Sequence, residues 1–380
     1  MAVNTTVNMT EYVNASVPST TSSPLGVANV SEMTALFVTN GTNDDNGTGV
    51  IWLANYWSSF VERPTSQQST SAGVWIRLVG LPPVMLLGIV GNILAILVMS
   101  RPAMRRHSFS SYLLLLGVCD TISLLVRLLF WVNLFLEFQG SPVLITFTNL
   151  PACIISEYFI TVNTVVCSWA VVCITYERVI IVIFPLTGTK LCKPFISRRV
   201  VVLLILFPLL LMSYIPFNTK YLPNLGCVMR YIPDMMIHYV MATTFVTMLP
   251  LALILFGNAV IIIQLKRQNK AITGTGNRED KVSRVTTMLV TVSLTFFILV
   301  LPNALMALLL ALRSDWGFLR VAVDPAAFLW DLNFAINFYL YVITGDNVRT
   351  EAREMFSCIK AMSNTGTTPA LQRDGTVARK

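Results

Sequence analysis

Charged residues are scarce in this sequence of 380 residues. Lys, Arg, Asp and Glu make up 12% of it, whereas a soluble globular protein carries about 25%. Histidine is scarcer still, with only His107 and His238, and neither an HExxH nor a GxSxG motif occurs. These absences argue against a soluble protein and against the common zinc- and serine-dependent hydrolases. We therefore expect a membrane protein that has no catalytic residues and is not an enzyme.

Residues 1–75 contain few basic residues and too few apolar ones to fold alone. No Lys or Arg precedes Arg63, and Thr, Ser, Asn and Gly are frequent, so we expect a disordered arm. No charged stretch followed by an apolar run opens it, which argues against a cleavable signal peptide. Six Asn-x-Ser/Thr sequons lie in the arm and none follows it, which indicates a glycosylated extracellular segment. The sequon residues are Asn4, Asn8, Asn14, Asn29, Asn40 and Asn46.

Long apolar segments occupy residues 76–344, and residues 345–380 form a polar tail. Each segment has the roughly 20 residues that a helix needs to cross a bilayer. The fold class that we expect is an all-α membrane protein, a bundle of seven transmembrane helices. The segments lie near 76–100, 109–135, 151–184, 197–217, 233–266, 282–311 and 321–344.

Lys and Arg are unevenly divided between the connections. Nineteen of them follow the first, third and fifth segments or lie in the tail, and six lie on the other side. The positive-inside rule places the larger set in the cytoplasm and the N-terminus outside, in agreement with the sequons. The net charge of +8 therefore reflects topology, and we expect a multi-pass plasma-membrane protein with lipid as a neighbour and no nucleic-acid partner.

The third segment contains an adjacent acid and base, Glu177 and Arg178, which would be costly to bury in hydrocarbon. Arg178 lies 25 residues after Cys153, about 37 Å along a helix, so the two residues fall at opposite membrane faces. The charged pair is thus expected at the cytoplasmic edge, where water begins. Cys227 is the only other outward-facing cysteine, and we expect a Cys153–Cys227 disulfide.

Short motifs occur in order along the seven segments. They are Gly91-Asn92, Leu116-Gly-Val-Cys-Asp120, Tyr176-Glu-Arg-Val179, Pro250, Phe296 followed by Pro302, and Asn333-Phe-Ala-Ile-Asn337-Phe-Tyr-Leu-Tyr341. In order and spacing they resemble the rhodopsin-like (class A) family of G-protein-coupled receptors, over about residues 76–358. The sequence departs from the family pattern at Phe338, where a Pro is usual, at Val300, where a Trp is usual, and at Asn258, where a Tyr is usual.

The resemblance implies a receptor that binds an extracellular ligand and activates a heterotrimeric G protein. It implies that Glu177 holds Arg178 at rest, and that Arg178 meets the G protein when the sixth helix moves outward. Asn337 and Tyr341 would stabilise the open form, and the sixth-segment residues of the same switch are Phe296 and Pro302. The alternative is that Glu177 and Arg178 are interfacial anchors whose charged ends reach water.

Polar residues also lie inside the predicted bundle. Asp120, Cys167 and Asn333 each fall eleven residues from the inner end of their segment, about 16 Å above the cytoplasmic edge. Asn163 and Asn337 fall within a turn or two of this layer, and a carboxylate among amides suits a small hard cation. The resemblance implies a sodium ion here, although Cys167 replaces an expected Ser. The alternative is a hydrogen-bonded packing network; we expect no other metal and no cofactor.

Candidate ligand contacts lie in the outer half of the bundle. They are Arg127, Glu157, Tyr158, Thr161, Trp330 and Asp331. Arg127 and Asp331 either pair with each other or face opposite charges on a ligand. The long glycosylated arm and the mixed charges favour a peptide, and the end of the seventh segment resembles invertebrate neuropeptide receptors of the FMRFamide type. A chemosensory receptor for small molecules is the alternative, and a transporter is disfavoured because no internal repeat is found.

The start of the tail, Asp346 to Cys358, is predicted to form a short amphipathic helix on the inner membrane surface. Cys358 ends it and is a candidate for palmitoylation; the alternative is an unmodified thiol. Hydroxyl residues are frequent further along, and the resemblance implies receptor kinases and arrestin as additional partners of this tail.

Overall fold

The computed structural model describes residues 73, 75–139, 150–222, 226–229, 237–238, 240–271, 277–312 and 317–365. The six sequons lie outside these residues, so the glycosylated arm stays a prediction. Seven helical stretches are long and apolar enough to cross a membrane, which confirms the seven-transmembrane bundle. They are Leu78–Met99, Phe109–Asn133, Leu150–Ile183, Pro194–Asn218, Val240–Arg267, Val285–Met306 and Val321–Thr344.

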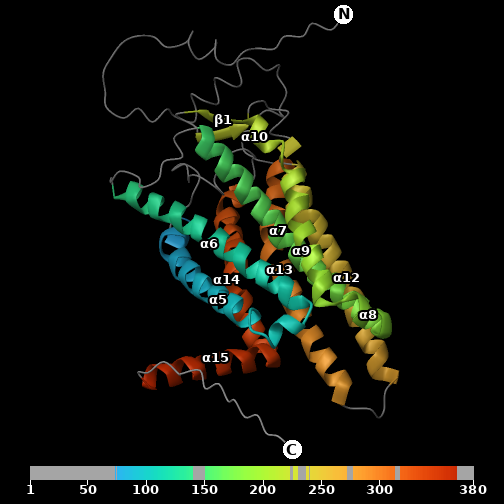
Figure 1. The fold of residues 1–380 in the computed structure, drawn as a ribbon. Helices are drawn as coiled ribbons and strands as arrows, with labels where there is room; N and C mark the ends of the chain where they lie inside the picture. Colours follow the sequence, from blue (N-terminus) through green and yellow to red (C-terminus); the bar gives the residue numbers. More distant parts are fainter. Residues whose placement is uncertain are drawn as a thin grey trace, which may run out of the picture. The chain divides into compact units, whose positions relative to one another are not determined.

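Seven long helices account for these spans (Figure 1). They are α5 (Leu81–Met99), α6 (Phe109–Phe138), α7 (Leu150–Ile183), α9 (Pro194–Leu211), α12 (Leu249–Ala271), α13 (Asn277–Leu312) and α14 (Gly317–Thr344). Two of them continue from a π-helical turn, α5 from η1 (Ile76–Gly80) and α12 from η3 (Thr243–Met248). The other helices are η2 (Met104–Arg106), α8 (Pro185–Leu191), α10 (Ile215–Asn218) and α15 (Asp346–Thr365).

Prolines set the boundary between α7 and α9. Phe184 precedes Pro185 and has left the helical region, with φ −124° and ψ 71°, because the proline ring crowds the helical conformation of the residue before it. Pro185 and Pro194 then open α8 and α9, since a helix needs no N–H donor in its first turn. The chain therefore turns at the end of α7, and the connection that follows places Cys192 beside Glu177.

The helices bury one side and leave an apolar side exposed. On α5, Met85, Ala95 and Val98 are buried against neighbouring helices, whereas Leu86 and Val90 are more than half exposed. Helices that are apolar all round are typical of membrane spans. The contacts in the described part of the chain place α14 between α5 and α13, and α7 between α6 and α12.

Two features extend the predicted architecture. Strands β1 (Thr219–Leu222) and β2 (Gly226–Met229) form an antiparallel hairpin that packs on α7. Cys227 lies in β2, opposite Tyr221, and Cys153 lies in the first turn of α7. The side chains of both cysteines are outside those described, so their disulfide stays a prediction. Helix α15 continues to Thr365, beyond the predicted end at Cys358, and the side chain of Cys358 is likewise not among those described.

Helix α15 packs on α14 and α5, at the end of the bundle that also holds the connections 100–108 and 184–193 (Figure 1). We call this the α15 end and the opposite one the hairpin end. An ion pair attaches α15 to the chain after α5, because Arg101 Nε lies 2.6 Å from Glu351 Oε2. The helix is thereby held against the bundle.

Close packing between α5 and α14 depends on Gly88. A Cβ added there would lie 2.6 Å from Ala335 Cβ and 2.6 Å from Leu124 Cδ1. Small residues let membrane helices approach this closely. At Gly80, by contrast, an added Cβ would lie 3.5 Å from Phe328, an ordinary van der Waals contact.

We expect Gly88→Ala to lower the thermal stability of the purified protein, because the added methyl overlaps the α14 backbone. The loss should be about 1–3 kcal/mol, as for other overpacked cores, measured by thermal melting in detergent. Gly80→Ala is the matched control and should melt at or slightly above the temperature of the parent protein. Equal melting temperatures for the two variants would contradict close α5–α14 packing at Gly88.

Candidate functional site

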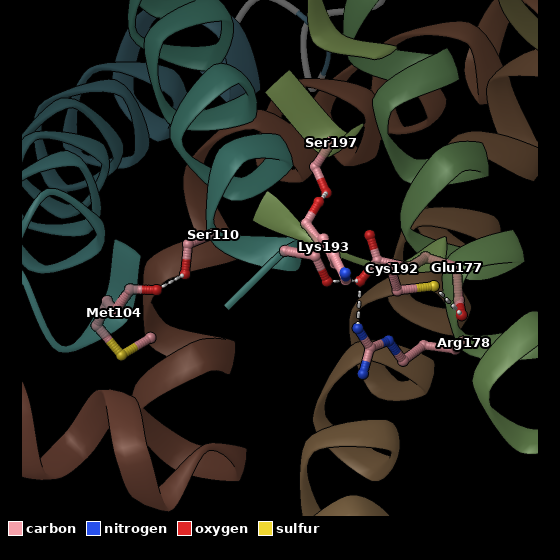
Figure 2. A network of polar contacts seen from close by, with 8 residues as sticks. Met104, Ser110, Glu177, Arg178, Cys192, Lys193 and Ser197 are labelled. Carbon is pink, nitrogen blue, oxygen red and sulfur yellow. Dashed lines mark hydrogen bonds and ion pairs between the residues drawn. The ribbon is translucent and has the colours of Figure 1, made fainter. Parts of the chain in front are cut away.

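The buried ion pair at the end of α7 lies where α6, α7 and the start of α9 converge (Figure 2). Arg178 Nη2 lies 2.5 Å from Glu177 Oε1, and the hydroxyl of Ser108, which precedes α6, donates a hydrogen bond to the same oxygen. The thiol of Cys192, before α9, lies 3.8 Å from the Glu177 carbonyl oxygen. The Glu177 carboxylate oxygen therefore links α7 to the turn that precedes α6.

Neither side chain of the pair reaches water. Glu177 and Arg178 are only 6% and 5% exposed, although counting along the helix had placed them where water begins. The guanidinium carbon of Arg178 also lies 5.6 Å from the ring centroid of Phe109, within the range of a cation–π contact. The pair is therefore held inside the bundle in this structure.

The surroundings of the pair keep nearby groups neutral. Burial, and then the charge of Glu177, raise the pKa of the Cys192 thiol to about 11, against a smaller opposing effect of Arg178. The His107 ring stacks on Phe109 with centroids 5.2 Å apart. Burial of this ring, and then the positive charge of Arg178, lower its pKa below the usual value. At neutral pH Cys192 and His107 therefore add no charge to the site.

The expected polar layer assembles around Asp120, which is fully buried. Its carboxylate accepts a hydrogen bond from Asn337 Nδ2 at 2.6 Å and one from the Cys167 thiol at 3.5 Å. Asn337 Nδ2 also lies 3.3 Å from the carbonyl oxygen of Asn333. Asp120 thereby links α6, α7 and α14 in the middle of the bundle.

Asn163 belongs to the layer but is directed elsewhere. Its Nδ2 donates to the carbonyl oxygen of Cys119 at 2.9 Å and to Ser123 Oγ at 2.8 Å, so it ties α7 to α6. Asn92 donates from Nδ2 to the carbonyl oxygen of Phe334 at 2.9 Å, while its buried Oδ1 has no hydrogen-bond partner among the described residues. The Asp120 carboxylate and the Asn92 amide oxygen are both hard oxygen donors.

Metal binding by a denser set of ligands finds no support in the described part of the chain. No group of three or more His, Cys, Asp or Glu side chains is arranged there to hold a metal ion. Any cation at the layer would thus depend on Asp120 and amide oxygens rather than on several charged ligands.

Arg127 and Asp331 form an ion pair between α6 and α14 toward the hairpin end. The guanidinium carbon of Arg127 lies 4.9 Å from the ring centroid of Phe334, so the cation is flanked by an acid and an aromatic face. Of the two predicted alternatives, the structure contains the pairing of these residues with each other.

The other candidate ligand contacts are distributed differently. Tyr158 donates from its hydroxyl to the carbonyl oxygen of Leu209 at 2.7 Å and thereby joins α7 to α9. Thr161, Glu157 and Trp330 are buried, the last beside Asp331 in sequence. Arg127 and Asp331 are in direct contact with each other through their ion pair.

The predicted switch residues near α13 lie in the core. Phe296 is 5% exposed and Tyr341 is 1% exposed, and Pro302 lies inside α13. The Tyr341 hydroxyl and Asn258 Nδ2 have no hydrogen-bond partner among the described residues. Ser293 on α13 donates to Asn258 Oδ1 on α12 at 2.9 Å, a link that connects these two helices.

Sequence reasoning missed Ser108 and Ser293 as members of these networks. Ser108 stands one residue before a long apolar run, where a hydroxyl is an ordinary helix-start signal, and nothing local predicts its contact with a residue 69 positions away. Ser293 lies within an apolar segment, where serine more often bonds to its own helix. Its distant partner depends on how α12 and α13 pack.

The sequence matches one protein-family model across most of its length. That family is described as "7 transmembrane receptor (rhodopsin family)", and the match covers residues 91–359. The matched region extends from α5 to α15 and includes the Glu177–Arg178 pair, the Asp120 layer and the Arg127–Asp331 pair.

We expect Arg127→Ala and Asp331→Ala each to destabilise the protein by about 3–5 kcal/mol, because either change leaves a buried charge without its partner. The double variant should lose less than the sum of the single losses, as contacting residues do in a double-mutant cycle. Thermal unfolding in detergent measures all three values. Arg101→Ala is the matched control, because the ion pair of Arg101 with Glu351 is nearer to the surface and its loss should lower the free energy of unfolding by only about 0–1 kcal/mol. Additive losses at Arg127 and Asp331 would contradict their coupling.

Proposed function

Since the chain belongs to the rhodopsin family of seven-transmembrane receptors, we propose that it detects an extracellular neuropeptide and signals through Arg178. Membership of the family makes it a G-protein-coupled receptor, a multi-pass membrane protein and not an enzyme. The observation that carries the proposal is the buried Glu177–Arg178 pair, held by Ser108 at the α15 end. A charge kept from water in this way is available to a partner only when the bundle rearranges.

The α15 end faces the cytoplasm in this proposal, and the N-terminus is extracellular. Two independent features of the sequence support this orientation: the six sequons lie before α5, and the excess of Lys and Arg lies in the connections at the α15 end. The hairpin end, with the Arg127–Asp331 pair below it, then faces the ligand. The Glu177–Arg178 pair faces the G protein.

Signal transfer requires two arrangements of the same helices. In the resting arrangement Glu177 and Phe109 hold Arg178. Outward movement of α13 opens the α15 end, and Arg178 turns from Glu177 to the G protein. A ligand shifts this equilibrium only by the difference in its affinity for the two arrangements, and displacements of packed helices are a common form of such switches.

The Asp120 layer lies between the two ends and connects the helices that have to move. Asp120 on α6 is hydrogen-bonded to Asn337 on α14 and to Cys167 on α7, and Arg127 on α6 pairs with Asp331 on α14. A ligand that separates Arg127 from Asp331 changes how α6 and α14 meet, and hence the contacts of Asp120. The change reaches α7, which carries Arg178.

A peptide suits the charges at the hairpin end. The Arg127 guanidinium would donate hydrogen bonds to a backbone carbonyl or an acidic group, and the Asp331 carboxylate would accept them from a basic side chain or an amide N–H. Amidated peptides that carry an Arg, as FMRFamide-type peptides do, supply both kinds of group. This charge complementarity supports a neuropeptide as the ligand.

We also propose that Asp120 binds a sodium ion in the resting arrangement. The buried carboxylate and the unpaired Asn92 Oδ1 support a hard monovalent cation, and bound sodium would supply positive charge that stabilises Asp120 in its ionised form. Asn337 would orient the carboxylate through its hydrogen bond. Cys167 contributes a thiol donor rather than a hard ligand.

We expect Arg178→Ala to reduce nucleotide exchange on purified G protein by roughly 5- to 150-fold, the range of a typical coupling free energy. Exchange is measured in nanodiscs with and without a mixture of FMRFamide-type peptides, and surface expression should be unchanged. Arg199→Ala is the matched control, because Arg199 is an exposed arginine at the same end of the bundle, stacked on Phe195. Undiminished exchange in Arg178→Ala would refute the switch.

We expect Asp120→Asn to abolish the stabilisation of the purified receptor by sodium chloride relative to choline chloride, because the carboxylate is the charged ligand. A bound ion stabilises by about 2.7 kcal/mol at a hundredfold excess over its Kd, and thermal melting measures the difference. Asn163→Ala should retain the sodium effect, since its amide nitrogen is bonded to α6. An equal response to sodium in the parent and in Asp120→Asn would rule the site out.

A further inference from the structure

The connection before α6 has a charge pattern that the proposed signalling function does not use. Residues 105–109 read Arg-Arg-His-Ser-Phe, which places two arginines three and two positions before Ser108. Arg105 and Arg106 are exposed, and neither forms an ion pair with any residue that the structure describes. Protein kinases select substrates by such charge patterns, and an arginine pair at this spacing fits the acidic substrate groove of an arginine-directed serine kinase.

The local backbone keeps this segment short and outside the helix. Met104–Arg106 form a single 3-10 turn, and His107 is extended, with φ −94° and ψ 136°. The His107 N–H donates to the carbonyl oxygen of Met104 at 3.0 Å, and Ser110 Oγ donates to the same oxygen at 2.6 Å. Phe109 is 3% exposed and lies beside Arg178, so extension of Arg105–Phe109 requires the start of α6 to leave its contacts with Arg178 and Glu177.

The hydroxyl of Ser108 is occupied while the switch is closed. It donates to Glu177 Oε1, and the residue is 6% exposed. Arg178 Nη2 contacts the same carboxylate oxygen, so Ser108 and Arg178 lie on either side of one atom. Any group attached to Ser108 Oγ would thus lie within reach of Arg178.

We propose that Ser108 is a phosphorylation site for an arginine-directed protein kinase, exposed when the Glu177 contact opens, and that its phosphate disables the Arg178 switch. The inference rests on the proposed function in one respect, that the α15 end faces the cytoplasm, where kinase and MgATP are present. In the reaction Ser108 Oγ bonds to the γ-phosphorus of ATP and the bond from that phosphorus to the ADP oxygen breaks. The hydroxyl proton passes to the catalytic base of the kinase.

The phosphate would reverse the charge balance around Arg178. A phosphoserine carries about −1.5 to −2 charges at neutral pH and has no hydroxyl proton to donate to Glu177. It repels the Glu177 carboxylate and attracts Arg178, which phosphate oxygens can bind in bidentate fashion. The modified receptor therefore keeps Arg178 paired at the bundle and away from the G protein.

The first test measures phosphate at Ser108. The full-length receptor in nanodiscs is incubated with the catalytic subunit of cAMP-dependent protein kinase and MgATP, and peptides are quantified by mass spectrometry. We expect phosphate at Ser108 and none at Ser110, with several-fold faster incorporation in Glu177→Ala, which removes the acceptor of the Ser108 hydroxyl. Arg105→Ala/Arg106→Ala should lower incorporation at least tenfold, because both changes lie on the surface and remove the recognition charges.

A synthetic peptide of residues 101–112 is the control for recognition by the kinase. Phosphorylation of this peptide together with no phosphate at Ser108 in either the parent receptor or Glu177→Ala would overturn the proposal. Incorporation that is unaffected by Arg105→Ala/Arg106→Ala would overturn it as well. Thermal melting of each variant confirms that the receptor is folded.

The second test measures the consequence. Nucleotide exchange on purified G protein is compared before and after kinase treatment, for the parent receptor and for Ser108→Ala. We expect treatment to reduce exchange several-fold in the parent and not in Ser108→Ala; an increase in the parent would overturn the capture of Arg178. The mass measurement needs no G protein and therefore tests the phosphorylation site separately from signalling. Phosphate at Ser108 that depends on Arg105 and Arg106, found together with full nucleotide exchange in Arg178→Ala, would show that the proposed switch fails while the phosphorylation site stands.

Discussion

The bundle at the α15 end depends on one carboxylate oxygen, Glu177 Oε1, which accepts from Ser108 and pairs with Arg178. Removal of a carboxylate and a guanidinium from water costs several kcal/mol for each ion, and the cost is offset only when nearly all their hydrogen-bonding groups are satisfied. Ser108 and the Phe109 ring supply part of that compensation from outside α7, while Arg178 Nε has no hydrogen-bond partner among the described residues. The pair is therefore stable only while α6 and α7 meet in this way, and helix packing and charge pairing have to change together.

The same constraint recurs toward the hairpin end. A polar group inside a membrane bundle is tolerated where another helix offers a partner. Asp120 has Asn337 and Cys167, and Arg127 has Asp331. Helix α6 takes part in each case, because Asp120 and Arg127 lie on it and Ser108 stands just before its first residue. A shift of α6 disturbs all three polar contacts, which makes this helix the physical connection between the two ends.

The seven spans, and the meeting of Asp120 with Cys167 and Asn337 at one level of the bundle, could be predicted from the sequence because both follow from counting along helices. About 20 apolar residues cross a bilayer, and the distance from Cys153 to Arg178 places the charged pair at one membrane face. Counting gives depth along a helix and carries no information about which neighbours cover a side chain. The burial of Glu177 and its contact with Ser108 therefore could not be predicted, and the hairpin β1–β2 packs on α7 through contacts that no local pattern encodes.

Three buried polar atoms are relevant to the switch that we propose. Arg178 Nε, Asn258 Nδ2 and Tyr341 OH lack hydrogen-bond partners among the described residues, and a buried unsatisfied group costs about 1–3 kcal/mol. They lie on α7, α12 and α14, so no rotation within one helix can satisfy them. An arrangement in which these helices separate would give all three atoms water or a polar partner, at the expense of the contacts of Glu177. In the switch that we propose, these three atoms would favour the open arrangement, and a ligand would supply the rest of the free-energy difference.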